Sequence, residues 1–121
     1  MALKLTLKPN EKMIIGGAVI TNGNSKSNLI IENKVPILRE KDILSETDAN
    51  TPGRRVYFAI QLMYIDDENL VVHQNSYWEL VKEFLSAAPS QLAVIDQMGE
   101  HILQRRYYKA LKLCRDLIIH E

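Results

Sequence analysis

Apolar and polar residues alternate over the first third of the chain. Between residues 3 and 8 every second residue is a leucine, and Lys4, Thr6 and Lys8 fill the other positions. This period of two places the leucines on one face of a strand. Further on, Gly16-Gly17 separates two apolar segments, and a glycine pair suits a hairpin turn because both residues can adopt positive φ. The pattern predicts antiparallel strands at residues 3–8, 12–15, 18–21, 28–32 and 35–38. The last is expected at a sheet edge because Pro36 has no N–H to donate.

From residue 45 onward, apolar residues recur every three or four positions, the spacing of one helix face. Two segments offer a start for the first helix. Ser45-Glu46-Thr47-Asp48 resembles a capping box, and Thr51-Pro52 supplies an N-cap threonine followed by proline at the first helical position. The helices are predicted at residues 52–65, 69–87, 90–103 and 105–119.

These elements predict an α+β fold in a single domain, residues 1–121. A small antiparallel β unit at residues 1–44 precedes a C-terminal four-helix bundle at residues 45–121. The β unit is too small to bury a core of its own, so it must pack on the helices or pair with a second copy. We expect a homodimer formed by β pairing.

The charges are balanced in total but unevenly placed. Fifteen Lys and Arg residues face fifteen Asp and Glu residues, and this argues against gripping nucleic acid through bulk positive charge. Residues 1–44 nevertheless carry seven basic and four acidic groups, residues 45–104 three and nine, and residues 105–121 five and two. Any site for a polyanion must therefore be local, at the basic ends of the chain.

A catalytic centre is not indicated. The three histidines lack metal-ligand spacing, and no glycine-rich phosphate loop or nucleophile elbow is present, so we expect no enzyme activity, no metal and no cofactor. The single cysteine, Cys114, lies at helical spacing among apolar residues, which favours a buried inert thiol. Asp66-Asp67-Glu68 offers oxygen ligands for a cation, but its position favours capping the second helix. With no signal peptide and no membrane span, we expect the cytoplasm.

Arg54 and Arg55 occupy the first turn of a predicted helix, where cations oppose the helix dipole. Two explanations remain open. A phosphate held by the free N–H groups after Thr51 would offset the two guanidinium groups. Alternatively, they form surface ion pairs with Glu46 or Asp48.

Arg105, Lys109 and Lys112 follow one another at spacings of four and three, which places them on one stripe of the last predicted helix. A basic stripe of this kind is either a track for phosphates or the solvated side of an amphipathic helix.

Four separated segments carry a resemblance: MALKLTLKP at 1–9, VPILREKDIL at 35–44, TPGRRVYFAIQLMY at 51–64 and YYKALK at 107–112. In this order and spacing they resemble the FlbT family of flagellin regulators. The resemblance runs through essentially the whole chain. It implies a cytoplasmic post-transcriptional repressor that associates with the 5′ untranslated region of flagellin mRNA and promotes its degradation, working alongside the small protein FlaF.

A second likeness covers only the first third of the chain. LTLKPNE at 5–11, MIIG at 13–16 and LREKDI at 38–43 are similar to the CsrA family of translational regulators, which bind mRNA leaders as intertwined dimers. By this likeness Lys8 and Arg39 would hold RNA. Leu7 departs from the pattern, which has another basic residue there.

The sequence thus predicts an RNA-binding protein in which Lys8, Arg39 and Lys41 contact phosphates and loop bases. Residues 1–44 contain no Phe, Tyr or Trp, so recognition there must depend on backbone and arginine contacts. The remaining candidate contacts are Arg54, Arg55, Arg105, Lys109 and Lys112. The alternative is a helical module or chaperone-like adaptor that binds flagellin or FlaF without touching RNA.

Overall fold

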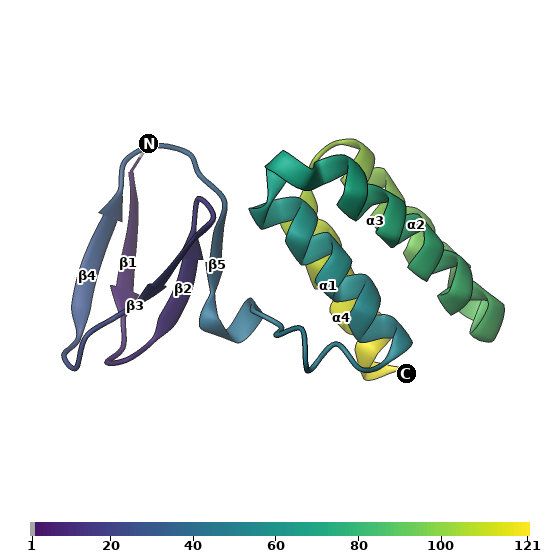
Figure 1. Cartoon of the computed structure of the whole chain (residues 1–121), viewed down its shortest axis with the longest axis horizontal. Coiled ribbons are helices and arrows are strands. Elements are labelled where there is room, and N and C mark those ends of the chain that lie inside the picture. The colour runs from purple at the N-terminus through teal and green to yellow at the C-terminus, as the bar shows by residue number, and fades with distance from the viewer. Residues whose placement is uncertain (1) are drawn as a thin grey trace. The chain divides into compact units, whose positions relative to one another are not determined.

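The structure is a computed structural model that describes residues 2–121. The chain forms two compact units, one ending at Ile43 and the other beginning at Leu44. Figure 1 shows strands in the first unit and helices in the second. The predicted α+β class, with strands followed by four helices, is confirmed.

The first unit contains five short strands: β1 (Leu3–Leu7), β2 (Lys12–Ile15), β3 (Ala18–Thr21), β4 (Ser27–Ile31) and β5 (Ile37–Arg39). β1 pairs with β4 in a two-stranded antiparallel sheet, and β2 lies between β3 and β5 in a three-stranded one. β5 lies at an edge, as predicted, but it begins one residue after Pro36, whose carbonyl accepts a hydrogen bond from the Gly16 amide at 2.9 Å.

The leucine alternation places Leu5 and Leu7 in a small core with Met13. The lysines of the same segment are exposed, as a period of two requires. Leu3 is the exception. It pairs with Ile31 at the end of the two-stranded sheet and remains 48% exposed.

The hairpin between β2 and β3 turns at Gly16 and Gly17, whose φ angles are 55° and 86°. Both angles lie in the region that a side chain disfavours and that a two-residue turn of this type needs. The predicted hairpin is confirmed.

The expected capping box at Ser45 is wrong. The Asp48 amide donates to both the carbonyl and the hydroxyl of Ser45, which closes a turn instead of starting a helix. The helix begins at the second signal, where the Thr51 hydroxyl accepts a hydrogen bond from the Arg54 amide at 3.2 Å and Pro52 occupies the first turn.

Four helices make up the second unit: α1 (Pro52–Ile65), α2 (Leu70–Ala87), α3 (Leu92–Leu103) and α4 (Tyr107–Ile119). α1 packs against α2 and α4, and α3 packs against α4. Their shared core contains Ile60, Met63, Tyr77, Met98 and Leu117, each at most 1% exposed. In the part of the chain described, no helix is both long and apolar enough to cross a membrane.

The last helix starts two residues later than predicted because Arg105 ends the preceding one. Arg105 has a φ of 59°, and its amide donates to the Ile102 carbonyl at 3.0 Å. The Arg106 amide donates to the His101 carbonyl at 2.7 Å. This pair of bonds is the Schellman ending of a helix, in which glycine is the usual left-handed residue. Arg105 is therefore not part of a stripe on α4, and that prediction is wrong.

The left-handed conformation of Arg105 predicts that Arg105→Gly stabilises the protein. A residue with an L side chain is less stable in this region by about 1–2 kcal/mol, and glycine avoids that strain. Part of the gain is lost because glycine also makes the unfolded chain more flexible, which lowers the free energy of unfolding. We expect the free energy of unfolding in urea to rise by roughly 0.5–1 kcal/mol. Arg106→Gly, at a φ of −96°, is the matched control and should destabilise. A stability loss for Arg105→Gly as large as the control's would contradict this assignment.

Candidate nucleic-acid interface

The first unit brings three predicted RNA-contacting residues together around a hollow of about 410 Å³. Lys8 follows β1, Arg39 ends β5, and Lys41 lies in the 3₁₀ turn Glu40–Asp42. β2 pairs with β5, Met13 opposite Arg39, and this pairing places the end of β5 beside the turn that leaves β1. The other lining residues are Pro9, Asn10, Glu11 and Glu40.

Arg39 ties the strands at this hollow to one another. Its Nη2 donates to the Thr6 carbonyl of β1 at 2.7 Å and to both carboxylate oxygens of Glu11, at 3.2 and 3.0 Å. Its Nε also donates to Glu11, at 3.3 Å. The Arg39 side chain is 33% exposed and that of Glu11 is 11% exposed. Arg39 thus holds β1, β5 and the turn after β1 together, and the Glu11 carboxylate partly neutralises its charge.

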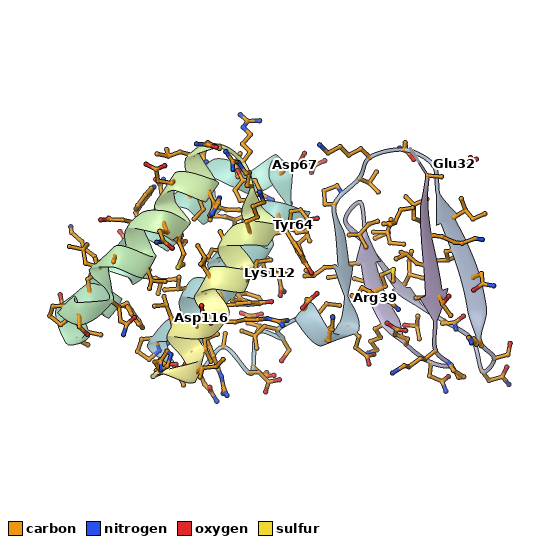
Figure 2. The ribbon with its side chains drawn as sticks, turned by 180° about the vertical axis from the view of Figure 1, so that it is seen from behind. Glu32, Arg39, Tyr64, Asp67, Lys112 and Asp116 are labelled. Carbon is orange, nitrogen blue, oxygen red and sulfur yellow. The ribbon has the colours of Figure 1, made fainter. Side chains whose placement is uncertain are left out.

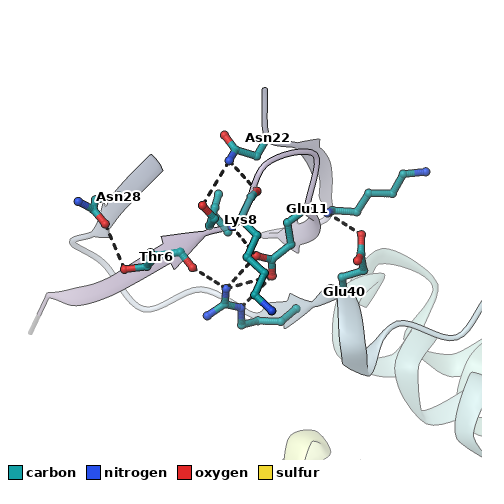
Figure 3. A network of polar contacts seen from close by, with 9 residues as sticks. Thr6, Lys8, Glu11, Asn22, Asn28 and Glu40 are labelled. Atoms are coloured by element: carbon teal, nitrogen blue, oxygen red, sulfur yellow. Dashed lines mark hydrogen bonds and ion pairs between the residues drawn. The ribbon is translucent and has the colours of Figure 1, made fainter. Parts of the chain in front are cut away.

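Glu11 closes the turn that carries Lys8 (Figure 3). The Lys8 amide donates to Glu11 Oε1 at 2.9 Å, and the Glu11 amide donates back to the Lys8 carbonyl at 3.1 Å. These contacts lower the pKa of Glu11, first through the Lys8 amide and then through Arg39. The second carboxylate of the hollow, Glu40, accepts from the Lys12 amide at 2.9 Å. Both carboxylates hold the backbone, and the exposed Lys8 ammonium has no ion pair within residues 2–121.

Asn22 is a site residue that sequence reasoning missed. Its side-chain amide donates to the Lys8 carbonyl at 2.8 Å (Figure 3) and to the Ser25 carbonyl at 3.0 Å. The turn after β1 and the loop after β3 are further joined by two backbone hydrogen bonds. The Asn10 amide donates to the Gly23 carbonyl, and the Asn22 amide donates to the Glu11 carbonyl. The Asn22-Gly23-Asn24 sequence signals a turn, but it does not say that the asparagine side chain spans to a distant loop.

At the start of α1 the structure supplies an anion that neither open explanation named. The Glu121 carboxylate accepts from the Gly53 amide and the Thr51 hydroxyl, both at 2.7 Å. Arg54 Nη1 donates to Asn50 Oδ1 at 3.0 Å, and Arg55 is exposed. The expected pairing of these arginines with Glu46 or Asp48 is not found among residues 2–121, and a carboxylate of the protein occupies the place predicted for phosphate.

On α4, Lys109 and Lys112 are both exposed. Lys112 Nζ lies 5.1 Å from the centre of the Tyr108 ring, within range of a cation–π interaction. The Tyr108 ring is in turn 6.4 Å from that of Tyr64 on α1. Figure 2 labels Tyr64 and Lys112 on these two helices.

The comparisons with known proteins decide the family. A family model described as "Flagellar protein FlbT" matches residues 3–121. The chain belongs to the FlbT family. No solved structure matches it, so the likeness of the first third to CsrA gains no support there.

Curated FlbT relatives align with the whole chain. It is 45% identical to the probable flagellum biosynthesis repressor protein FlbT 1 of Bradyrhizobium diazoefficiens, with 83% of that protein covered. It is 41% identical to the probable flagellum biosynthesis repressor protein FlbT of Rhodopseudomonas palustris, with 95% covered. It is 37% identical to the flagellum biosynthesis repressor protein FlbT of Caulobacter vibrioides, with 87% covered.

Two other features of this FlbT-family chain have structural roles. Asp66 accepts hydrogen bonds from Asn69 and from His73 Nε2, the latter at 2.9 Å, which lowers the pKa of Asp66. The expected capping of the second helix by Asp66-Asp67-Glu68 is wrong: Asn69 is the N-cap of α2, and no side chain forms a capping hydrogen bond there. Cys114 is fully buried, its thiol donates to the Gly53 carbonyl at 3.6 Å, and burial raises its pKa.

The Glu11–Arg39 pair predicts a pH-dependent stability. A carboxylate whose pKa is lowered in the folded state stabilises it above the pKa of the unfolded chain, near 4.5, and loses this contribution as pH falls through the folded-state pKa. Glu11→Gln should therefore be less stable than the parent protein at pH 7, and the difference should shrink below pH 4. Urea unfolding at pH 7 and pH 3 measures this. Glu32→Gln, an exposed carboxylate after β4, is the control, and a difference for Glu11→Gln that ignores pH would contradict the ion pair.

The Glu121 contacts predict that this residue stabilises the start of α1. Glu121→Ala leaves the Gly53 amide and the Thr51 hydroxyl without their acceptors, and loss of a helix-capping side chain costs about 0.5–2 kcal/mol. We expect a loss of about 1 kcal/mol in unfolding free energy, and a smaller one for Glu121→Gln, which keeps one acceptor oxygen. Glu100→Ala, exposed on α3, is the control. We call these two contacts of the Glu121 carboxylate the Glu121 latch. Equal unfolding free energies for Glu121→Ala and its control would contradict a stabilising role for the latch.

Proposed function

We propose that this protein represses flagellin synthesis after transcription, by binding the 5′ untranslated region of flagellin mRNA and promoting its degradation. The names of its FlbT relatives, flagellum biosynthesis repressors, support the flagellar and repressive part of this role. The hollow lined by Lys8, Arg39 and Lys41 supports direct contact with RNA.

The gathering of these three cations is the observation that carries the proposal. They come from three separate segments, and a zero net charge does not prevent a local positive site. Both carboxylates at the hollow already accept hydrogen bonds from backbone amides, which holds them in place and leaves the exposed Lys8 ammonium for a phosphate. Phosphate contacts of this kind position an RNA strand and make its affinity depend on salt.

Arg39 acts in this proposal by holding the site in shape. Its bonds to Glu11 and Thr6 fix the turn that presents Lys8, so little conformational freedom is lost when RNA binds. Removing Arg39 would disturb the turn as well as the charge. Lys8, whose ammonium makes none of these bonds, is therefore the better residue for testing RNA contact, with Lys41 as the second lining lysine.

The second candidate is the protein-binding module, and a groove on the helical unit favours it. A hollow of about 390 Å³ is lined by Phe58, Ala59, Leu62 and Leu80 together with the polar residues Glu46, Arg55, His73 and Ser76. A groove between helices that combines apolar and charged side chains is suited to an amphipathic segment. Flagellin or FlaF would be the occupant in this case, and the effect on mRNA would be indirect.

RNA binding predicts that Lys8→Ala and Lys41→Ala each weaken the complex with a flagellin leader RNA and lower its salt dependence. Each lost phosphate contact should reduce the slope of log affinity against log salt by about 0.7 for a single strand. Fluorescence anisotropy over a salt series measures both quantities. Lys34→Ala is the control, because Lys34 and Lys8 lie at opposite ends of the two-stranded sheet. Lys34 follows the end of β4, which pairs with the start of β1, and Lys8 follows the end of β1.

If neither variant changes the affinity for RNA or its salt dependence, the hollow lined by Lys8 and Lys41 is not the RNA-binding site. If the purified protein forms no complex with RNA at physiological salt until flagellin or FlaF is added, the second candidate replaces the first.

A further inference from the structure

The first turns of α4 place an aromatic ring and an ammonium group together on the surface. Tyr108 is 37% exposed, and Lys112, one helical turn later, holds its Nζ 5.1 Å from the ring centre. The ring of Tyr64, on α1, has its centre 6.4 Å from that of the Tyr108 ring and is inclined to it by 42°. Figure 2 labels Tyr64 and Lys112.

The needs of the core do not explain this exposed pair. Tyr107, the preceding residue, is the buried aromatic of α4, together with Leu111 and Cys114 on the same face. Tyr108 and Lys112 belong to a different face, and Lys109 between them is exposed as well. The segment of the chain that carries the pair is basic, since residues 105–121 contain five basic and two acidic groups.

We propose that Tyr108 is a stacking site for one unpaired base of single-stranded RNA, with Lys112 contacting the adjoining phosphate. This inference rests on the proposed function and adds to it a base contact that residues 1–44, without any aromatic side chain, do not offer. Every base has a π face, so the contact tolerates different sequences. The Lys112 ammonium lies over the Tyr108 ring, so a base that stacks on that face displaces it, and the displaced ammonium meets the adjoining phosphate.

Trp78 is more exposed than Tyr108, at 47%, yet it does not suit the same ligand. Its ring packs edge-on against Tyr77 at 5.0 Å, and it lies within residues 45–104, which carry nine acidic and three basic groups. Trp78 is therefore the matched control: an exposed aromatic on a helix of the same unit, whose ring is held edge-on against a buried tyrosine.

The test compares binding of a short single-stranded leader RNA by the full-length protein and its variants. Tyr108→Ala should weaken binding about tenfold, within the range found for losing one base–aromatic stack. Tyr108→Phe, which keeps the ring, and Trp78→Phe should bind like the parent protein. The salt slope should stay unchanged for Tyr108→Ala, because no phosphate contact is lost, whereas Lys112→Ala should lower it by about 0.7.

A second readout keeps the test independent of folding. An RNA with abasic positions should bind the parent protein more weakly and should bind Tyr108→Ala no worse than intact RNA does. Circular dichroism melts identify a variant that is simply unfolded, and Tyr108→Leu then takes its place.

The outcomes separate the two proposals. If Lys8→Ala weakens RNA binding but Tyr108→Ala does not, the stacking site is wrong and the proposed function stands. If Tyr108→Phe loses as much affinity as Tyr108→Ala, the hydroxyl matters instead of the ring, and stacking is overturned. If the parent protein binds no RNA at all, both proposals fail. Intact RNA binding by Tyr108→Ala with lost binding of FlaF or flagellin would assign the pair to a protein interface.

Discussion

The ion pair between Arg39 and Glu11 is the constraint on which the β unit's candidate site depends. The unit has two small sheets and a core of few large side chains, so polar contacts carry an unusual share of its order. One guanidinium reaches the Thr6 carbonyl of β1 and the carboxylate of Glu11, and that carboxylate also holds the Lys8 amide. Strand β5, the end of β1 and the turn after it are therefore held to one another by this ion pair.

At two positions of the described chain, a carboxylate of the protein occupies a place where an anion could bind. Glu11 faces Arg39, and Glu121 accepts from the amide and hydroxyl at the start of α1. A cation that is paired as Arg39 is offers little net attraction to a phosphate, because the paired carboxylate would have to be displaced or tolerated. Under the proposed function, a lysine outside such an ion pair, such as Lys8, is consequently a better phosphate contact than Arg39, whereas the CsrA likeness marked the two residues alike.

Local signals predicted most of the fold, and contacts over long sequence separations account for what they missed. The leucine alternation, the Gly16-Gly17 turn and the Thr51-Pro52 helix start each act within a few residues, and all three were correct. The Glu121 latch spans 68 residues from Gly53, and no local pattern encodes it. The end of α3 was predicted correctly at residue 103, but Arg105 was wrongly assigned to the last helix, because an arginine occupies a left-handed position where glycine is the usual signal.

The same distinction explains which parts of the candidate site the sequence could give. Residue type alone marked Lys8, Arg39 and Lys41 as cations, but only the pairing of β2 with β5 places them around one hollow. Spacing alone joined Arg105 to Lys109 and Lys112, and the left-handed turn at Arg105 separates it from them. The sequence pattern assigned no role to Tyr108, and only the structure shows that it is exposed with the Lys112 ammonium over its ring. A charged or aromatic side chain therefore becomes a candidate contact for a ligand only when the structure shows which groups of the protein it already contacts.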